Sequence, residues 1–487
     1  MGYTWREKVA LRKNIAKRNE NVLPIFLPVP DSLTRSEGAN LAIIGLLSTL
    51  FGLSAFFWAY NYWRVWQLKQ RVAKALLQRG HNEHKHGVFQ IWGTHGYTAV
   101  VSPDFLEEIG NLPAGYIDFY EAAMKISNDR RLQVCEAGRL LVIPYHTILK
   151  DMTQKMWGLT PDLEEELVYA IRTEIPECKD WTAVTIQPKL LRIVALLTGR
   201  ISVGPELNRN EEWIATSSSF MTDIYVAGAA KSVGSADQGT KSAHCQKPQD
   251  WMQGLMDKNS EEENPRRFEE LSNIHLLLCF AALHTSTMAI THILFDLAAY
   301  PEYVKPLREE QRVVKEAFDC VPSKAAYLKM IKMDSFIKES QRHNPPSMLT
   351  YSRLVMKDFT LSNGVTFKPG AYFVIPAGPV LLDNDSWEDA NEFRGFRFSE
   401  MRAQGPEESH KYQYATISNN ALHFGHGRLG CPGRLFAGYE TKAMTARFTE
   451  MFEIKLLDPK MGRPENTNLG AAVILDSNLQ IILRKRN

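Results

Sequence analysis

The sequence FGHGRLGCPG, from Phe424 to Gly433, decides the fold and places one cysteine, Cys431, among four glycines. Glycine adopts left-handed backbone without steric cost, so Gly427 and Gly430 suit a tight loop, and Gly433 leaves room for a large flat ligand. The segment that follows has helical character. The free N–H groups and the positive dipole end of a helix N-terminus favour thiolate over thiol. The loop therefore predicts a cysteine suited to ligating iron.

Two other interpretations of this loop stay open on local grounds. His423, His426 and Cys431 are residue types that bind zinc, although no fourth ligand of suitable spacing stands nearby. A lone cysteine is also most commonly a buried structural residue. The chain has six cysteines, none of them in a CxxC pair, and this pattern fits free thiols in a reducing compartment.

Three segments ahead of this loop hold polar side chains at defined spacings. Glu339 and Arg342 lie three residues apart, so on a helix they share a face and can pair, most simply as a surface ion pair. Arg397 follows within the segment FRGFRF. His284 and Thr285 lie in a long apolar helical pattern, where a threonine commonly bonds back to the carbonyl four residues earlier. A histidine there is commonly packed in the core. Taken singly, each segment has an ordinary structural explanation.

In this order, the four segments resemble the motifs of the cytochrome P450 family, over nearly everything after residue 60. Phe-x-x-Gly-x-x-x-Cys-x-Gly is similar to the family's haem-binding signature, and Glu-x-x-Arg with a later arginine is similar to its buried cluster. Thr285 takes the place of the family's threonine, which helps to deliver protons to dioxygen. His284 replaces the usual acid, and it could relay protons because histidine has an ordinary pKa near neutrality.

The resemblance implies a fold that is mainly α with a small β region and that binds haem b (iron-protoporphyrin IX). It implies a monooxygenase that inserts one oxygen atom from dioxygen into a hydrophobic small molecule such as a terpenoid, because the His–Thr pair resembles fungal enzymes of secondary metabolism. Electrons would come from NADPH through a separate reductase, since the chain has no nucleotide-binding glycine fingerprint.

The same resemblance assigns roles to individual residues. The catalytic pair is Thr285 with His284. The cofactor-binding residues are Cys431, as axial ligand of the haem iron, with Phe424, Gly427, Arg428 and Gly433. The structural cluster is Glu339, Arg342 and Arg397, and the pocket is expected to involve Leu349, Thr350, Ala472 and Val473.

Two departures from the family pattern bear on activity. Leu429 stands where the family usually has an arginine or histidine that pairs with a haem propionate, and Arg353 is a candidate replacement. The segment at about 226–250 is small and polar without a helical period, where the family has two helices over the substrate pocket, so we expect a shortened lid. The alternatives are a haem-thiolate isomerase or dehydratase that needs no reductase, against which Thr285 argues, and a degenerate haem-binding protein without turnover.

A membrane anchor is predicted near the N-terminus. Leu41 to Tyr60 reads LAIIGLLSTLFGLSAFFWAY, twenty residues without a charge, enough to span about 30 Å of hydrocarbon as a helix. A buried core helix is the alternative, but such helices rarely stay apolar on every face. Basic residues follow the span, and only Arg35 is basic in the twenty residues before it. This predicts an endoplasmic reticulum protein that crosses the membrane once, with its catalytic domain in the cytosol.

The predicted organisation is a basic polar tail at 1–40, a transmembrane helix at 41–60 and a haem-thiolate monooxygenase domain at 61–487. With 44% apolar and 23% charged residues the chain can bury a large core, and a net charge of +2 gives no reason to expect a nucleic-acid partner. Two strands are predicted within 87–101, a long helix over 268–300, short strands after Arg353, and a last helix over 432–452.

Overall fold

The computed structural model describes residues 3–4, 74–93, 96–127, 157–219, 236–237, 267–469 and 471–486. The predicted tail and transmembrane span, and all of the predicted short lid except Ala236–Asp237, lie outside these residues. None of the helices described is both long and apolar enough to cross a membrane. The chain divides into two compact units, and the site belongs to the larger one, Leu77–Lys231 with Cys245–Asn487. In the smaller unit, β1 (Tyr3–Thr4) pairs in parallel with β6 (Ala236–Asp237).

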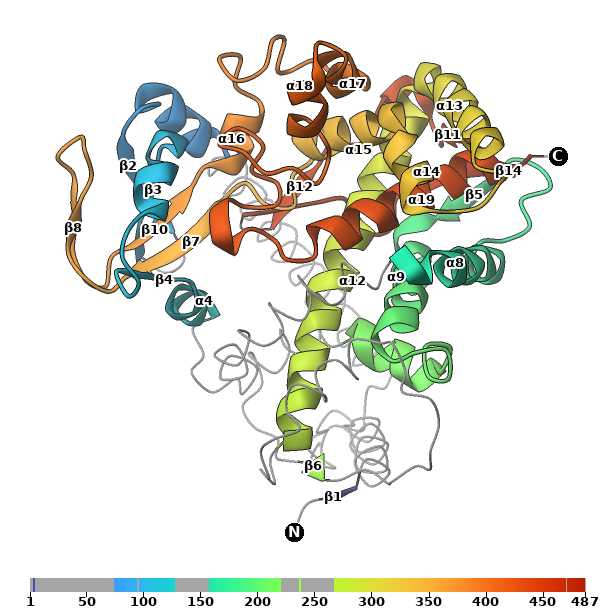
Figure 1. Cartoon of the computed structure of the whole chain (residues 1–487), viewed down its shortest axis with the longest axis horizontal. Helices are drawn as coiled ribbons and strands as arrows, with labels where there is room; N and C mark the ends of the chain where they lie inside the picture. Colours follow the sequence, from blue (N-terminus) through green and yellow to red (C-terminus); the bar gives the residue numbers. More distant parts are fainter. Residues whose placement is uncertain are drawn as a thin grey trace, which may run out of the picture. The chain divides into compact units, whose positions relative to one another are not determined.

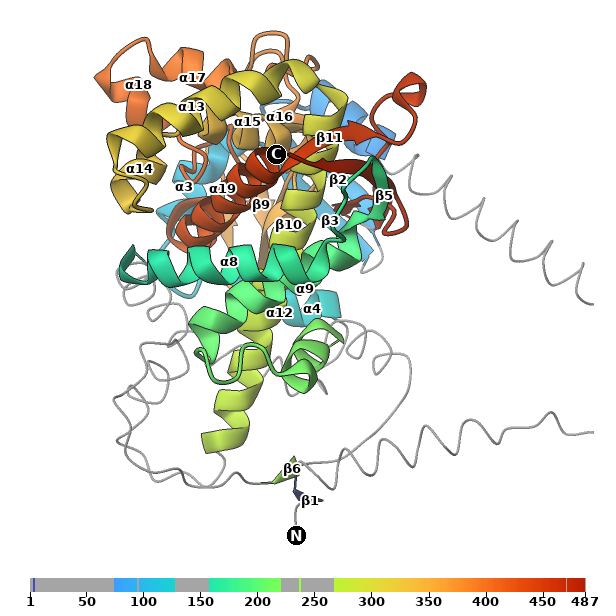
Figure 2. The ribbon, with the colours of Figure 1, turned by 90° about the vertical axis from the view of Figure 1, so that its right-hand side faces the viewer.

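The long helix α12 (Arg267–Ala299) is the element around which the larger unit is built. Its 33 residues extend about 50 Å. It ends directly before Tyr300 and Pro301, as the sequence predicts, because proline cannot continue the hydrogen-bond ladder of a helix. In Figures 1 and 2 the main sheet lies on one side of α12, and α8 and α9 lie on the other.

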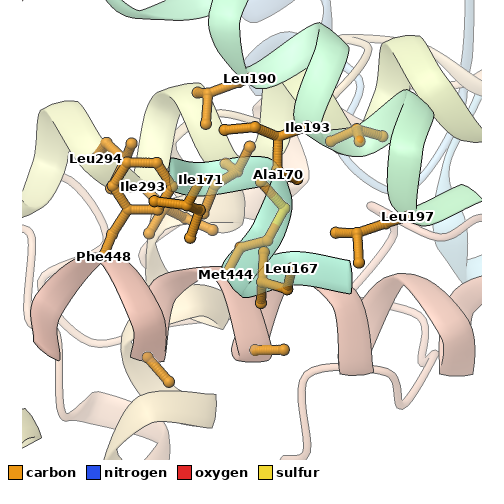
Figure 3. Packing of buried hydrophobic residues seen from close by; sticks show 14 of the residues in the cluster. Leu167, Ala170, Ile171, Leu190, Ile193, Leu197, Ile293, Leu294, Met444 and Phe448 are labelled. Carbon is orange, nitrogen blue, oxygen red and sulfur yellow. The ribbon is translucent and has the colours of Figure 1, made fainter. Parts of the chain in front are cut away.

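The helical core forms where α8 (Thr160–Glu174) and α9 (Ile186–Ser202) pack with α12 and with α19 (Arg434–Met451). Figure 3 shows buried side chains from all four helices meeting in one cluster. Those labelled are Leu167, Ala170, Ile171, Leu190, Ile193, Leu197, Ile293, Leu294, Met444 and Phe448. This packing fixes α12 relative to α19, the two helices that border the candidate site.

The main sheet has five strands in the order β2-β3-β10-β7-β4. β2 (Val88–Gly93) and β3 (Gly96–Val101) are antiparallel with Gly93 opposite Gly96, so the strand pair predicted within 87–101 is confirmed. The strands predicted after Arg353 are also found. They are β7 (Thr350–Val355), β8 (Phe359–Thr360), β9 (Thr366–Phe367) and β10 (Tyr372–Ile375). Gly364 has a φ of 86°, which suits the turn between β8 and β9.

Further helices and strands complete the unit. The helices are α3 (Leu106–Gly110), α4 (Phe119–Ser127), α13 (Val304–Ala317), α14 (Lys324–Lys329), α15 (Ile331–His343), α16 (Ala377–Leu381), α17 (Arg397–Arg402) and α18 (Pro406–Lys411). The strands are β4 (Ile117–Asp118), β5 (Thr182–Thr185), β11 (Phe452–Leu456), β12 (Thr467–Leu469), β13 (Ala472–Ile474) and β14 (Gln480–Lys485). The prediction of a mainly helical fold with a small β region is therefore confirmed.

Candidate active site

A cavity of about 590 Å³ lies between α12, the start of β7 and the loop that precedes α19. Cys431 faces it from the loop, and Thr285 and Ser286 face it from α12. Much of the remaining wall is apolar and includes Phe119, Leu278, Ala282, Leu349, Phe436 and Ala437. Of the predicted pocket residues, Leu349 and Thr350 line the cavity and Ala472 and Val473 do not. An apolar hollow with a few converging polar groups is the usual form of a small-molecule site.

Cys431 lies just ahead of α19 and not in its first turn. The predicted helix start at Pro432 is wrong by two residues, because the chain is still turning at Gly433, which is the N-cap. The Cys431 N–H donates to the Phe424 carbonyl at 2.7 Å and closes the loop. Burial raises the pKa of the Cys431 thiol and outweighs the backbone N–H groups of Gly433 and Arg434, which lower it. A metal cation at the sulfur would lower this pKa and favour the thiolate.

Different structural features favour glycine at the different positions of the loop. Gly425 and Gly427 have φ angles of 75° and 64°, in the left-handed region. Gly430 is extended, but a Cβ there would lie 2.9 Å from Ile417 Cδ1, so the end of the Ile417 side chain would have to shift to admit it. A Cβ at Gly433 would lie 4.0 Å from the Cys431 sulfur, at the edge of the cavity. Gly433 thus leaves the space beside the sulfur open, and its contact with a flat ligand stays a prediction.

Helix α12 lines the cavity with small side chains at every fourth residue. Ala281, Thr285 and Ala289 line the cavity from one face of the helix. The Thr285 hydroxyl donates back to the Ala281 carbonyl at 2.6 Å. His284 does not line the cavity, and burial lowers its pKa. The structure therefore brings Thr285 to the site, while a catalytic role for His284 stays a prediction.

One acidic residue near the cavity was missed in the sequence. Glu440 is buried in α19, and neither of its carboxyl oxygens makes a hydrogen bond of standard geometry. Burial raises its pKa to about 8, while the approach of the Ser286 hydroxyl acts in the opposite direction. Glu440 is thus protonated at neutral pH, directly behind a serine of the cavity wall. Its position nine residues after Cys431 gave no signal, because only the packing of α19 on α12 reveals it.

Glu339, Arg342 and Arg397 meet in one buried cluster. Glu339 lies 2.8 Å from Arg342 Nη2 and 3.2 Å from Arg397 Nε, and the three side chains are 0%, 1% and 4% exposed. A surface ion pair is therefore excluded. Arg342 also donates to the carbonyls of Leu381 and Ala390 at 2.8 and 2.6 Å. Burial would raise the pKa of Glu339, but hydrogen bonds, above all from Arg342, lower it to about 2.

His423 directly precedes the cysteine loop and contacts the backbone of Tyr414. Its Nε2 lies 3.1 Å from the Tyr414 carbonyl. Burial, with the nearby charge of Lys338, lowers the pKa of His423 to about 3, so the ring is neutral at pH 7. In the part of the chain that the structure describes, no group of three or more His, Cys, Asp or Glu residues could hold a metal ion. The zinc interpretation of His423, His426 and Cys431 therefore gains no support.

Comparison with known proteins decides which kind of site this is. A family model described as Cytochrome P450 matches residues 226–483. Cytochrome P450 monooxygenase AN1598 of Emericella nidulans is 31% identical over 94% of this chain and 94% of its own length. The chain belongs to the cytochrome P450 family. This is a family of oxidoreductases, and its members that resemble this chain include fungal monooxygenases.

Further relatives agree with this assignment. Cytochrome P450 monooxygenase olcJ of Penicillium canescens is 31% identical over 84% of this chain and 83% of its own. Ent-kaurene oxidase of Gibberella intermedia is 28% identical over 87% of this chain and 86% of its own. The solved structure of retinoic acid bound cyanobacterial CYP120A1 matches with a TM-score of 0.61 and 16% identity, over 84% of this chain and 94% of that one. This last match shows the cytochrome P450 fold alone.

The cavity fits the haem that the cytochrome P450 family binds. Cys431 offers a sulfur ligand, and Gly433 leaves the space beside it open. Arg353 lines the cavity with a side chain that is 3% exposed, and it forms no ion pair with a carboxylate of the described residues. A buried cation without an anion is costly, and the haem propionates would supply the missing negative charge.

The other predicted cofactor residues are placed unevenly. Phe424 lines the cavity, with its ring 5.1 Å from that of Tyr414. Gly427 and Arg428 are exposed and do not line the cavity, so their contact with the cofactor stays a prediction. Leu429 belongs to the turn Gly427–Leu429, but its side chain is outside the described part of the chain.

Replacing Arg342 tests the buried cluster. We expect Arg342→Lys to lower the free energy of unfolding by about 3 kcal/mol, because lysine cannot reach both Glu339 and the two backbone carbonyls. Arg312→Lys is the matched control, since Arg312 pairs with Glu309 and Glu316 on an exposed helix face and should tolerate the change. Urea unfolding at pH 7 measures both. Equal losses in the two variants would contradict a special role for the cluster.

Replacing Glu440 tests the buried neutral carboxyl. Between the ordinary pKa of 4.5 and the raised value of about 8, the folded state holds a proton that the unfolded state has lost. Wild-type stability should therefore fall in this window as pH rises, by about 1.4 kcal/mol per pH unit from this group. Glu440→Gln removes that loss, so its advantage over the wild type should grow from pH 5 to pH 8. Exposed Glu407→Gln is the control, and a pH-independent difference at Glu440 would refute the assignment.

Proposed function

We propose that this chain is a haem b-dependent monooxygenase that inserts one atom of dioxygen into a hydrophobic small molecule such as a terpenoid. The observation that carries the proposal is that Cys431, Thr285, Ser286 and an apolar wall all line one cavity. The similarity to an ent-kaurene oxidase supports a substrate of that kind. The fungal relatives support a place in secondary metabolism.

The residues that line the cavity would have different chemical roles. Haem, when bound, would supply the activation of dioxygen by two electrons. Cys431 would hold the iron, and its thiolate would favour cleavage of the O–O bond. The apolar wall would hold the substrate by burying its surface and would keep bulk water out. Thr285 and Ser286 would place hydroxyl groups at that wall, and Glu440 would keep a proton on its carboxyl behind Ser286.

We further propose a separate NADPH-dependent reductase as the electron donor and an anchor in the endoplasmic reticulum membrane, with the catalytic domain in the cytosol. The sequence supports the reductase because no nucleotide-binding glycine fingerprint is present. It supports the anchor through the uncharged stretch at 41–60 and the basic residues after it. A substrate dissolved in the bilayer would then reach the cavity from the membrane.

The test combines the purified full chain with a fungal NADPH-dependent reductase, a panel of terpenoid hydrocarbons and isotopically labelled dioxygen. We expect one labelled oxygen atom in the product, and product formation that requires both NADPH and the reductase. Conversion without NADPH would establish the isomerase or dehydratase alternative instead. Bound haem without conversion of any substrate or consumption of NADPH would establish the degenerate alternative.

Replacing Thr285 tests proton delivery. We expect Thr285→Ala to reduce product formed per NADPH about ten-fold or more, with reducing equivalents lost to hydrogen peroxide, because the Thr285 hydroxyl at the cavity wall is gone. Thr291→Ala is the control: Thr291 donates back to the Thr287 carbonyl in the same helix but is buried away from the cavity. Product and peroxide are measured together. Unchanged coupling in Thr285→Ala would refute the role.

A further inference from the structure

We propose that Tyr351 is a positioning residue whose ring holds the Arg353 guanidinium in place to bind the carboxylates of haem. The inference rests on the haem site proposed above. It adds a residue of this chain to that site, and it explains how one arginine can serve where the cysteine loop has the aliphatic Leu429.

The cavity wall at the start of β7 has an unusual geometry for a strand. Five consecutive residues, 349 to 353, all line the cavity. In a regular strand successive side chains point to opposite faces, so only alternate residues of such a run could face one cavity. The backbone must therefore depart from regular strand geometry within this stretch.

That departure is a β-bulge at Tyr351. Arg353 pairs with Phe373 and Thr350 pairs with Ile375, so Tyr351 and Ser352 together lie opposite a single residue of β10. Tyr351 has a φ of 54°, in the left-handed region that costs a bulky side chain about 1–3 kcal/mol. Bulges redirect side chains beside active sites. Here the bulge accounts for the unbroken run of cavity-lining residues that includes Tyr351 and Arg353.

The two side chains are in direct contact. The Arg353 guanidinium carbon lies 3.9 Å from the centre of the Tyr351 ring and 5.4 Å from that of Phe119. Its Nη1 donates to the Ser352 carbonyl at 2.7 Å. An aromatic face attracts a desolvated guanidinium without using its N–H donors. The ring therefore fixes the orientation of Arg353 and leaves donors available for a ligand.

The charge of the cavity lining favours an anionic ligand. Arg353 is the one arginine or lysine among the described residues that line it. Burial lowers the pKa of Arg353, while Tyr351 and Asp118 raise it. His426 also lines the cavity, but burial lowers its pKa, so it is not a second fixed cation. The propionates of haem, as planar carboxylates, match the donor edge of a guanidinium.

The test measures the rate at which the full-length holoprotein loses its haem to excess apomyoglobin. Each protein is loaded during expression either with haem or with haem dimethyl ester, which lacks the carboxylate charges. We expect Tyr351→Leu to lose haem about ten-fold faster than the wild type, the size of one partly buried cation–π contact. With the dimethyl ester, Tyr351→Leu and the wild type should lose the cofactor at the same rate.

Two controls separate positioning from general packing. Tyr351→Phe keeps the ring, so its rate of haem loss should stay close to that of the wild type. Tyr169→Leu makes the same change in α8, where the tyrosine ring also lies on an arginine, Arg209, at 3.8 Å but outside the cavity lining, and it should have no effect.

Each contrary outcome has a distinct meaning. Tyr351→Leu at the wild-type rate, an equal effect on haem and its ester, or an equal loss in Tyr351→Phe would overturn the inference. A wild-type protein that binds no haem would instead overturn the proposed function.

Discussion

The ion pair between Glu339 and Arg342 has no access to water, and Arg397 shares the same carboxylate. Removing these charges from water is costly unless every arginine donor finds an acceptor. The acceptors are backbone carbonyls of the segment from Leu381 to Glu392, which therefore has to stay against α15. Because the buried arginines need these carbonyls, the cluster constrains the path of the chain between the helices and the cysteine loop.

The same helix also supports the loop directly. Asp334 of α15 accepts a hydrogen bond from the Tyr414 N–H at 2.9 Å, and the Tyr414 carbonyl lies 3.1 Å from His423 Nε2. His423 precedes Phe424, whose carbonyl accepts from the Cys431 N–H. A chain of buried polar contacts therefore runs from α15 to the cysteine. It holds the sulfur at a buried site, where burial raises the pKa of the thiol.

Short sequence motifs predict much of this structure. The glycine loop around Cys431 and the end of α12 before Pro301 each depend on residues that are close together in the sequence. The sequence alone therefore predicts both features. The start of α19 was misplaced by two residues because Pro432 can begin a helix, and only the path of the loop shows that it does not. Tyr351 and Glu440 were not predicted. A left-handed bulge depends on strand pairing, and a raised carboxyl pKa depends on burial between two helices distant in sequence.

The central claim is that Cys431 holds haem iron through its sulfur in this fold. The most direct measurement is the carbon monoxide difference spectrum of the reduced, purified protein, with Cys431→Ser compared with Cys320→Ser at an exposed cysteine. The account predicts the long-wavelength band of thiolate-ligated haem in the wild type and in Cys320→Ser, and its loss in Cys431→Ser. A wild type without haem, or a Cys431→Ser protein that kept this band, would contradict it.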